Sequence, residues 1–224
     1  MSVRSRQLLR KADLPRVGAA EMIASALRDR ILQGEVRPGD ALREVDVANA
    51  FGVARNTVRE ALKLLIRSGL ATHEVHHGVA VRRITAQDVN DIYALRELLE
   101  LAAASRAGKL TDGEVASLTK PVEDGQTAID GGDIWASTMA NQAFHKAIIK
   151  LLHNPRAEAV HDDLLTELSL GLMLEERNAA AALDWARRNR ELLDLFVSGP
   201  PGRCRPALAA YLDDARTHLL SYVL

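Results

Sequence analysis

Residues 42–81 read LREVDVANAFGVARNTVREALKLLIRSGLATHEVHHGVAV, and this stretch decides how the first part of the chain folds. Apolar residues recur at helical spacing on both sides of Gly52, which suits the left-handed turn between two helices. The runs LATHEV and VAVRRI then flank Gly78, as in a β-hairpin. We therefore predict helices over about 44–51 and 55–68, followed by a hairpin: a winged helix-turn-helix.

The second of these helices has two unlike faces. Arg55 and Arg59 lie one turn apart on its polar face. The apolar stripe behind them consists of Val58, Ala61, Leu62 and Leu65. Such a helix can be buried on one side and contact DNA on the other. A further helix, over about 19–33, precedes the pair and ends at Gly34.

Charge is distributed unevenly along the 224 residues. Residues 1–83 hold 15 Lys and Arg against 9 Asp and Glu, a net charge of +6, whereas the remainder holds 14 against 21, a net charge of −7. Positive charge around the helix pair favours binding to phosphates, and the negative remainder would be repelled by them. The basic part contains one aromatic residue, Phe51, so stacking on single-stranded RNA is disfavoured.

The rest of the chain predicts a mainly α protein of two domains. We expect a flexible basic arm over 1–18, the winged helix-turn-helix over 19–83 and an all-α bundle of about six helices over 84–224. Cys204 is the single cysteine, so no disulfide can form within the chain. No apolar run reaches membrane-spanning length and no signal peptide is evident, so we expect a cytoplasmic protein without membrane contact.

The sequence resembles a known family in several segments. PGDALREVDVANAFGVARNTVREALKLLIRSGLATHEVHHGVAV looks like the DNA-binding domain of GntR-type bacterial transcription regulators. DIYALRELLE, NQAFHKAIIKLLHNP, NRELLDLF and ARTHLL are similar to the FCD effector domain of the FadR subfamily. The resemblance implies a homodimeric regulator that binds a short inverted repeat in double-stranded DNA and responds to a small molecule. We expect it to be a repressor.

The resemblance also implies which residues contact the operator. Arg55 and Arg59 would bind guanine edges or phosphates, Asn56 and Thr57 would bind near the helix N-terminus, and the wing residues His77 and Gly78 would enter the neighbouring groove.

Two positions depart from the family pattern. Val45 stands where many relatives carry arginine, and Ala54 replaces a serine or threonine. Each change removes an expected contact, and the second also removes a capping side chain.

Four polar residues of the second domain fall where helical periodicity points inward. Asn141 and His145 lie four residues apart on an apolar stripe, while Asn189 and His218 share faces with aromatic and apolar residues. Buried polar groups require partners, so residues from three helices suggest a polar centre. The centre could bind an organic acid, hold an ion, or consist of satisfied core groups.

An ion at this centre would be divalent, of the zinc or nickel class, held by His145, His218 and Asn141. In metal-binding members of the resembled family the corresponding set is one aspartate and three histidines. Here Asn141 and Asn189 replace two of them, which removes the negative charge and weakens metal binding.

Arg96 lies on the apolar face of the domain's first helix. Its guanidinium could receive the carboxylate of an effector together with the polar quartet, or it could form an internal salt bridge to Glu100. A metal-assisted hydrolase is a further alternative, but the quartet offers no general base or nucleophile, so we expect no enzymatic activity. His153 and His161 lie near predicted helix ends, where surface or capping roles are expected.

Overall fold

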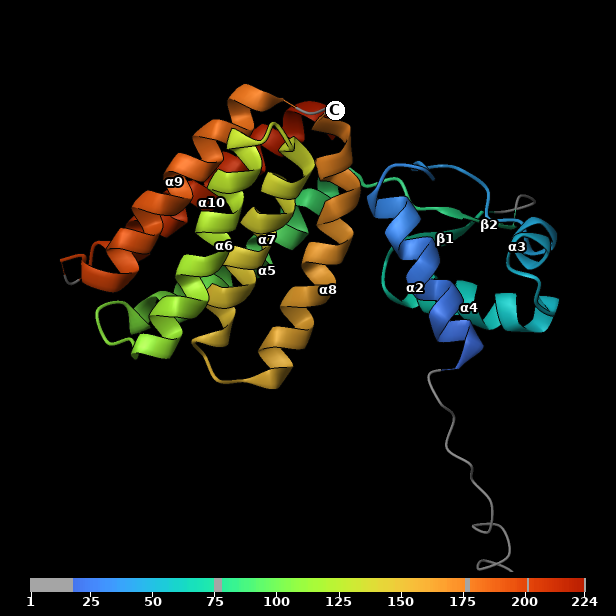
Figure 1. The fold of residues 1–224 in the computed structure, drawn as a ribbon, viewed down its shortest axis with the longest axis horizontal. Helices are drawn as coiled ribbons and strands as arrows, with labels where there is room; N and C mark the ends of the chain where they lie inside the picture. Colours follow the sequence, from blue (N-terminus) through green and yellow to red (C-terminus); the bar gives the residue numbers. More distant parts are fainter. Residues whose placement is uncertain (1–17, 75–77, 176–177, 201, 224) are drawn as a thin grey trace, which may run out of the picture. The chain divides into compact units, whose positions relative to one another are not determined.

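The computed structural model describes residues 18–74, 78–175, 178–200 and 202–223. Of the basic arm predicted for residues 1–18, only Gly18 is described. The wing residue His77 also lies outside the described residues. The chain divides into two compact units (Figure 1). The first comprises the residues up to Arg67 together with Ala71–Val81, and the second comprises Ser68–Leu70 and the chain from Arg82 onward.

The first unit has the predicted order of elements. Its helices pack α2 on α4 and α3 on α4, and the two strands pair as one antiparallel hairpin. The helix and strand boundaries agree with the predicted ranges to within one or two residues at most ends. The elements are α2 (Ala19–Leu32), α3 (Glu44–Phe51), α4 (Arg55–Arg67), β1 (Ala71–Glu74) and β2 (Gly78–Val81).

The helix-turn-helix depends on one glycine. Gly52 caps α3 with φ of 64°, a left-handed conformation, and its N–H donates to the carbonyl of Ala48. Beyond α4, the strand register runs from the Ala71–Val81 pair to the Glu74–Gly78 pair. The predicted apolar stripe of α4 is confirmed as the core of this unit: Val58, Ala61, Leu62 and Leu65 are all buried.

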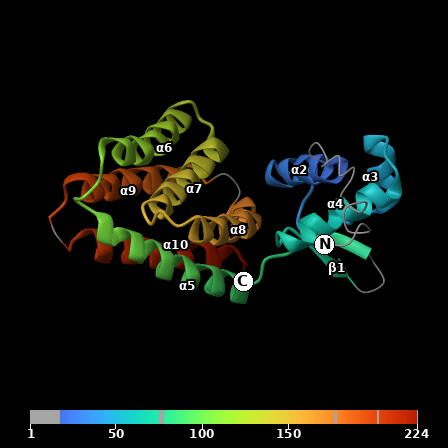
Figure 2. The same ribbon diagram turned by 90° about the horizontal axis from the view of Figure 1, so that it is seen from below.

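The second unit is a bundle of six α-helices and two short 3-10 turns in the described part of the chain. Helix α6 packs on α7 and α9, α7 on α8 and α9, and α5 on α10. The last pair, from the two ends of the unit, lies side by side in Figure 2. The helices are α5 (Ala86–Ala103), α6 (Asp112–Asp130), α7 (Ile134–Lys150), α8 (Pro155–Leu172), α9 (Ala179–Ser198) and α10 (Cys204–Val223).

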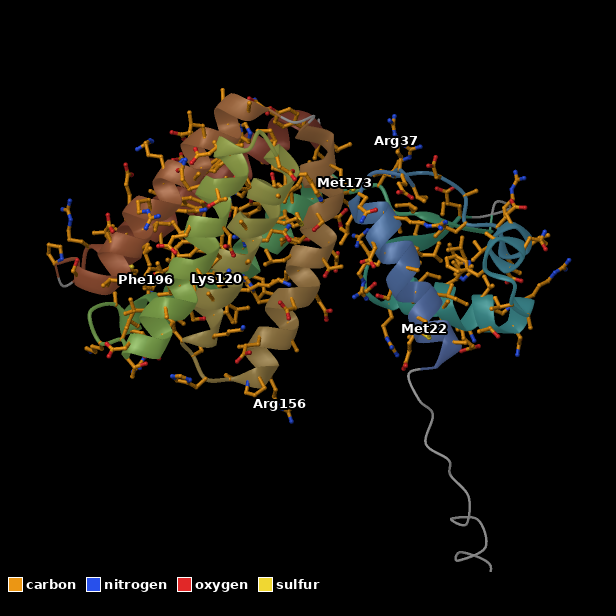
Figure 3. The ribbon with its side chains drawn as sticks, in the orientation of Figure 1. Met22, Arg37, Lys120, Arg156, Met173 and Phe196 are labelled. Atoms are coloured by element: carbon orange, nitrogen blue, oxygen red, sulfur yellow. The ribbon has the colours of Figure 1, made fainter. Side chains whose placement is uncertain are left out.

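Side-chain caps fix where most of these helices begin. Thr85 and Thr111 each form a capping box with an acidic residue three positions on. Asp133, Asn154 and Asn178 accept hydrogen bonds from the first turns of α7, α8 and α9. The helices enclose an apolar core in which Phe196 is fully buried (Figure 3). Within the described residues, no helix is both long and apolar enough to cross a membrane.

Candidate DNA-reading surface and effector centre

The polar face of α4 is exposed as the sequence predicts. Arg55, Asn56 and Arg59 are exposed and Thr57 is half-buried, while the stripe behind them is buried. The face therefore offers two guanidinium groups and an amide to a partner without disturbing the core. Contact of these residues with DNA remains a prediction, because it follows from their exposure and chemistry alone.

Arg59 is held by a glutamate of the neighbouring helix. Its Nε donates to Oε1 of Glu44 at 2.9 Å and its Nη2 donates to Oε2 at 2.8 Å, a bidentate pair between α3 and α4. Its Nη1 lies 3.5 Å from Oδ1 of Asn56. The hydrogen bond from Arg59 holds the pKa of the Glu44 carboxyl below its usual value. Periodicity within α4 could not reveal this partner, because Glu44 lies 15 residues earlier in the chain.

Val45 and Ala54, the two departures from the resembled pattern, are both exposed. Val45 on α3 is 42 % exposed, so it presents an apolar side chain to solvent. Ala54 precedes α4 and contributes its carbonyl, which accepts from the N–H groups of Thr57 and Val58. In the wing, Gly78 opens β2 with φ of 83°. Neither Val45 nor Ala54 offers a polar side chain to DNA.

A buried carboxylate organises the interior of the second unit. Glu100 on α5 is 0 % exposed and accepts three charge-assisted or polar hydrogen bonds. Its Oε1 lies 2.9 Å from Nε of Arg96 and 3.0 Å from Nε2 of His161, and its Oε2 lies 2.6 Å from Nδ1 of His145. Residues of α5, α7 and α8 thus meet at one carboxylate.

The partners of Glu100 keep it ionised. Burial alone would raise the pKa of its carboxyl. Arg96 and His145 lower the pKa by more than burial raises it, so the pKa lies well below the usual value. Burial lowers the pKa of His145, and the charge of Arg96 acts in the same direction. His145 is therefore neutral near pH 7, and its Nδ1 carries the proton that it donates to the ionised Glu100.

Arg96 adopts the internal salt bridge that the sequence left open. The guanidinium and the carboxylate lie four residues apart on α5, and both side chains are almost completely buried. The arginine also lies over the ring of Tyr93, 4.9 Å from its centroid. Its Nε is therefore occupied by Glu100, which limits how it could receive the carboxylate of an effector.

Three buried polar atoms of α7, α8 and α9 have no hydrogen-bond partner in the described part of the chain. Two belong to the far sides of the histidine rings that bond Glu100, His145 Nε2 and His161 Nδ1. The third is Oδ1 of Asn189 on α9, one helical turn from Trp185, whose ring lies 5.1 Å from that of Tyr211. Asn189 is 4 % exposed. Buried polar atoms without partners are rare in native proteins, so each is a candidate point of contact for a bound molecule.

Asn141 pairs with a tyrosine that sequence reasoning did not select. Its Nδ2 donates to the hydroxyl of Tyr211 at 3.0 Å, and the hydroxyl lies 3.3 Å from its Oδ1. The ring of Tyr211 also lies 5.1 Å from that of His145, centroid to centroid. Burial raises the pKa of the Tyr211 phenol above its usual value, so it stays protonated. The α10 residue beside Asn141 and His145 is therefore Tyr211.

His218 lies two turns further along α10 and stacks on other aromatic rings. Its ring is 5.7 Å from that of Trp185 and 5.3 Å from that of Tyr222. Trp185 in turn lies 5.1 Å from Tyr211, which links His218 to the polar centre through two aromatic side chains.

The expected surface or capping role of His161 is wrong. This histidine lies within α8, is 1 % exposed and is bonded to Glu100. The available signal was its spacing from Leu165 and Leu168, which places all three on one buried helical face. His153 is exposed on its side chain and lies 3.1 Å from Glu114, in agreement with a surface role.

The described residues contain no group of three His, Cys, Asp or Glu side chains arranged to hold a metal ion. The predicted set of His145, His218 and Asn141 offers two imidazoles and one amide and contains no carboxylate. Whether it binds an ion remains a prediction.

Comparison with known proteins assigns both units. Residues 19–81 match the family described as bacterial regulatory proteins of the gntR family, and residues 91–214 match the FCD domain. The transcriptional regulator YdhC of Bacillus subtilis is 33 % identical over 130 residues, which are 57 % of this chain and 58 % of the relative. A protein of Paenarthrobacter nicotinovorans, named "Probable D-xylose utilization operon transcriptional repressor", is 26 % identical over 85 % of this chain and 87 % of its own.

A solved structure of another GntR regulator has a similar fold. The crystal structure of a GntR transcriptional regulator from Rhodococcus sp. RHA1 superposes with a TM-score of 0.84 at 28 % identity, covering 90 % of this chain and 97 % of that one. These families are transcriptional regulators, which sets aside the hydrolase alternative. The protein therefore belongs to the GntR family of bacterial transcriptional regulators and carries an FCD effector domain.

Proposed function

We propose that this regulator is a cytoplasmic homodimeric repressor whose binding to a short inverted-repeat operator is modulated by a small organic acid in the FCD domain. The repressor assignment is supported by the printed name of the Paenarthrobacter relative. Two copies of the first unit would each place α4 in the major groove, with half-sites about one helical turn apart. Ligand binding would alter how readily both copies fit their half-sites.

The observation that carries the proposal is the contrast between the two faces of α4. Arg55, Asn56 and Arg59 are exposed on a helix whose opposite face is fully buried in the core. A guanidinium can donate two hydrogen bonds to guanine in the major groove, and an amide can do the same with adenine. The fixed bidentate pair with Glu44 keeps Arg59 oriented on that face before DNA arrives.

The effector part rests on the polar centre around Glu100. Residues of five helices contribute polar atoms to this interior, and three of these atoms have no partner in the described chain. Polar groups that converge in an otherwise apolar interior are what small-molecule sites use to fix a ligand. The effector-contact set predicted from sequence, Arg96, Asn141, His145, Asn189 and His218, gains support from this convergence for all members but His218.

The proposal is tested by selection and competition. The purified chain is incubated with a pool of random DNA duplexes, and the retained sequences are determined. An inverted repeat bound by two chains is expected, and a set of small carboxylates should change its affinity. Retention of duplexes without a shared sequence, or of bulk RNA with equal affinity, would contradict operator recognition.

A divalent ion is the second candidate for the effector centre. One observation favours it: the Nδ1 of His145 is held by a carboxylate, as in many metal-binding histidines, and its Nε2 has no partner. Elemental analysis of protein purified without chelator or nickel affinity resin tests this candidate. About one equivalent per chain would support it, and less than about a tenth would remove it.

A further inference from the structure

The atoms without partners at the polar centre are hydrogen-bond acceptors. Oδ1 of Asn189 can only accept. His145 donates from Nδ1 to Glu100, so its neutral ring presents a lone pair at Nε2. Whatever completes the hydrogen bonds of His145 Nε2 and Asn189 Oδ1 must therefore supply donors.

A divalent ion fits this set of atoms poorly. The ligands available to it are imidazole nitrogen and amide oxygen, all neutral, because both oxygens of Glu100 are occupied by protein donors. Asn141 is already bonded to Tyr211. An ion would also lie near the buried guanidinium of Arg96, whose charge repels it. Neutral ligands beside a buried cation do not favour zinc or nickel.

A simple carboxylate also leaves the acceptors unsatisfied. An ionised carboxylate only accepts hydrogen bonds, so it cannot pair with His145 Nε2 or with Asn189 Oδ1. An alcohol hydroxyl both donates and accepts, and it carries no charge to oppose Arg96 or Glu100. Hydroxyl groups therefore match the unpartnered atoms, whether or not the same molecule also bears a carboxylate.

We infer that the effector of this FCD domain is a hydroxylated small molecule whose hydroxyl groups donate to Nε2 of His145 and Oδ1 of Asn189. The inference rests on the proposed function, since it names the chemical class of the ligand at the same centre. It differs from a general preference for organic acids because the hydroxyl groups, rather than the acid group, complete the buried hydrogen bonds.

Matched acids test the hydroxyl groups directly. Gluconate and hexanoate have the same carbon number and charge, as do threonate and butyrate, and each pair differs in hydroxyl groups. Calorimetry on the full chain should show that, in at least one pair, the hydroxylated acid binds at least about tenfold more tightly than the unsubstituted acid. The unsubstituted acid would leave the buried acceptors unpaired. Equal affinity within both pairs, no binding of either hydroxylated acid, or one equivalent of divalent metal per chain would overturn the inference.

A pair of variants tests the same point without any ligand. Asn189→Leu removes an acceptor that has no partner, so the melting temperature of the ligand-free protein should stay the same or rise. Asn141→Leu removes the partner of the buried Tyr211 hydroxyl and should lower the melting temperature. Asn189→Leu should also abolish the preference for gluconate over hexanoate. A melting temperature that falls equally in both variants would show that Asn189 is already paired and would overturn the inference.

The outcomes for the two claims are separable because operator binding is measured beside ligand binding. If an unsubstituted acid, hexanoate or butyrate, releases the operator as effectively as the hydroxylated acid of the same pair, the proposed function stands and the hydroxyl inference fails. If gluconate or threonate binds selectively and the operator complex is unchanged, the ligand class stands and its proposed role in regulation fails.

Discussion

Two arginine–glutamate pairs, one in each unit, differ mainly in their access to water. In the first unit, Arg59 and Glu44 are bonded at 2.8 and 2.9 Å while their side chains are 53 % and 33 % exposed. In the second, Arg96 and Glu100 are bonded at 2.9 Å and are 3 % and 0 % exposed. The same chemistry therefore operates in two very different dielectric environments.

The difference shows which pair can change partners. An exposed pair gains little from its mutual attraction because water screens both charges, so a phosphate or a base can replace one partner at low cost. A buried pair cannot be opened without leaving a charge uncompensated in the interior. We therefore expect Arg59 to exchange its contacts when DNA binds and Arg96 to keep its carboxylate in every state of the domain.

The largest effect is expected at the buried pair. Glu100→Gln removes the charge that balances Arg96 and should lower the free energy of unfolding of the second unit by about 3–5 kcal/mol. Urea denaturation followed by circular dichroism measures the change. Glu97→Gln, at an exposed position of the same helix, is the matched control and should change the stability by less than about 0.5 kcal/mol. Similar values for both variants would contradict the contrast between the pairs.

The winged unit was predictable because its signals are local. Gly52 marks the turn, and the apolar spacing of Val58, Ala61, Leu62 and Leu65 is a property of one helix, so both were readable and both are confirmed. The Glu44–Arg59 pair could not be predicted, because it joins two helices and depends on how they pack against each other.

The polar centre was predictable only in part, for the same reason. Inward-facing Asn141, His145 and Asn189 followed from periodicity on their own helices, and the alternative salt bridge of Arg96 was a contact within one turn. The contacts of His161 with Glu100 and of Tyr211 with Asn141 cross 61 and 70 residues. Such contacts depend on how helices pack, which residue spacing within a single helix cannot report.

The second largest effect is expected for DNA binding. Arg59→Ala should weaken operator binding by about 1–3 kcal/mol while leaving the fold intact, because the exposed guanidinium contributes to recognition and not to the core. Fluorescence anisotropy with a labelled operator measures the loss. Arg156→Ala removes the same charge from an exposed position on α8 (Figure 3) and should leave the affinity nearly unchanged. An unaltered affinity for Arg59→Ala would contradict the assignment of this face.

A smaller effect on stability is expected at a helix cap of the second unit. Thr85→Ala removes the side chain that accepts from the N–H of Asp88 and should cost about 1 kcal/mol in the free energy of unfolding. Thr127→Ala is the control, since that hydroxyl bonds a carbonyl within α6 on an exposed face. A cost equal to that of Glu100→Gln would show that burial is not what makes the buried pair strong.

The smallest change in stability is expected for the exposed pair itself. Glu44→Gln should alter the free energy of unfolding less than Thr85→Ala does, because water screens an exposed ion pair and it contributes little. Its effect on DNA should be distinct: loss of a negative charge beside Arg55 and Arg59 should raise the affinity for unrelated duplexes. The looser guanidinium should at the same time lower the ratio of operator to unrelated affinity.

A double-mutant cycle decides whether Glu44 acts through Arg59. In the Arg59→Ala background, Glu44→Gln should no longer change the ratio of operator to unrelated affinity, although the gain in affinity for all duplexes should persist. The first quantity reports orientation of one side chain, and the second reports charge alone. If the ratio falls equally in both backgrounds, Glu44 contributes to recognition by another route, and the exposed pair is no more than a surface contact.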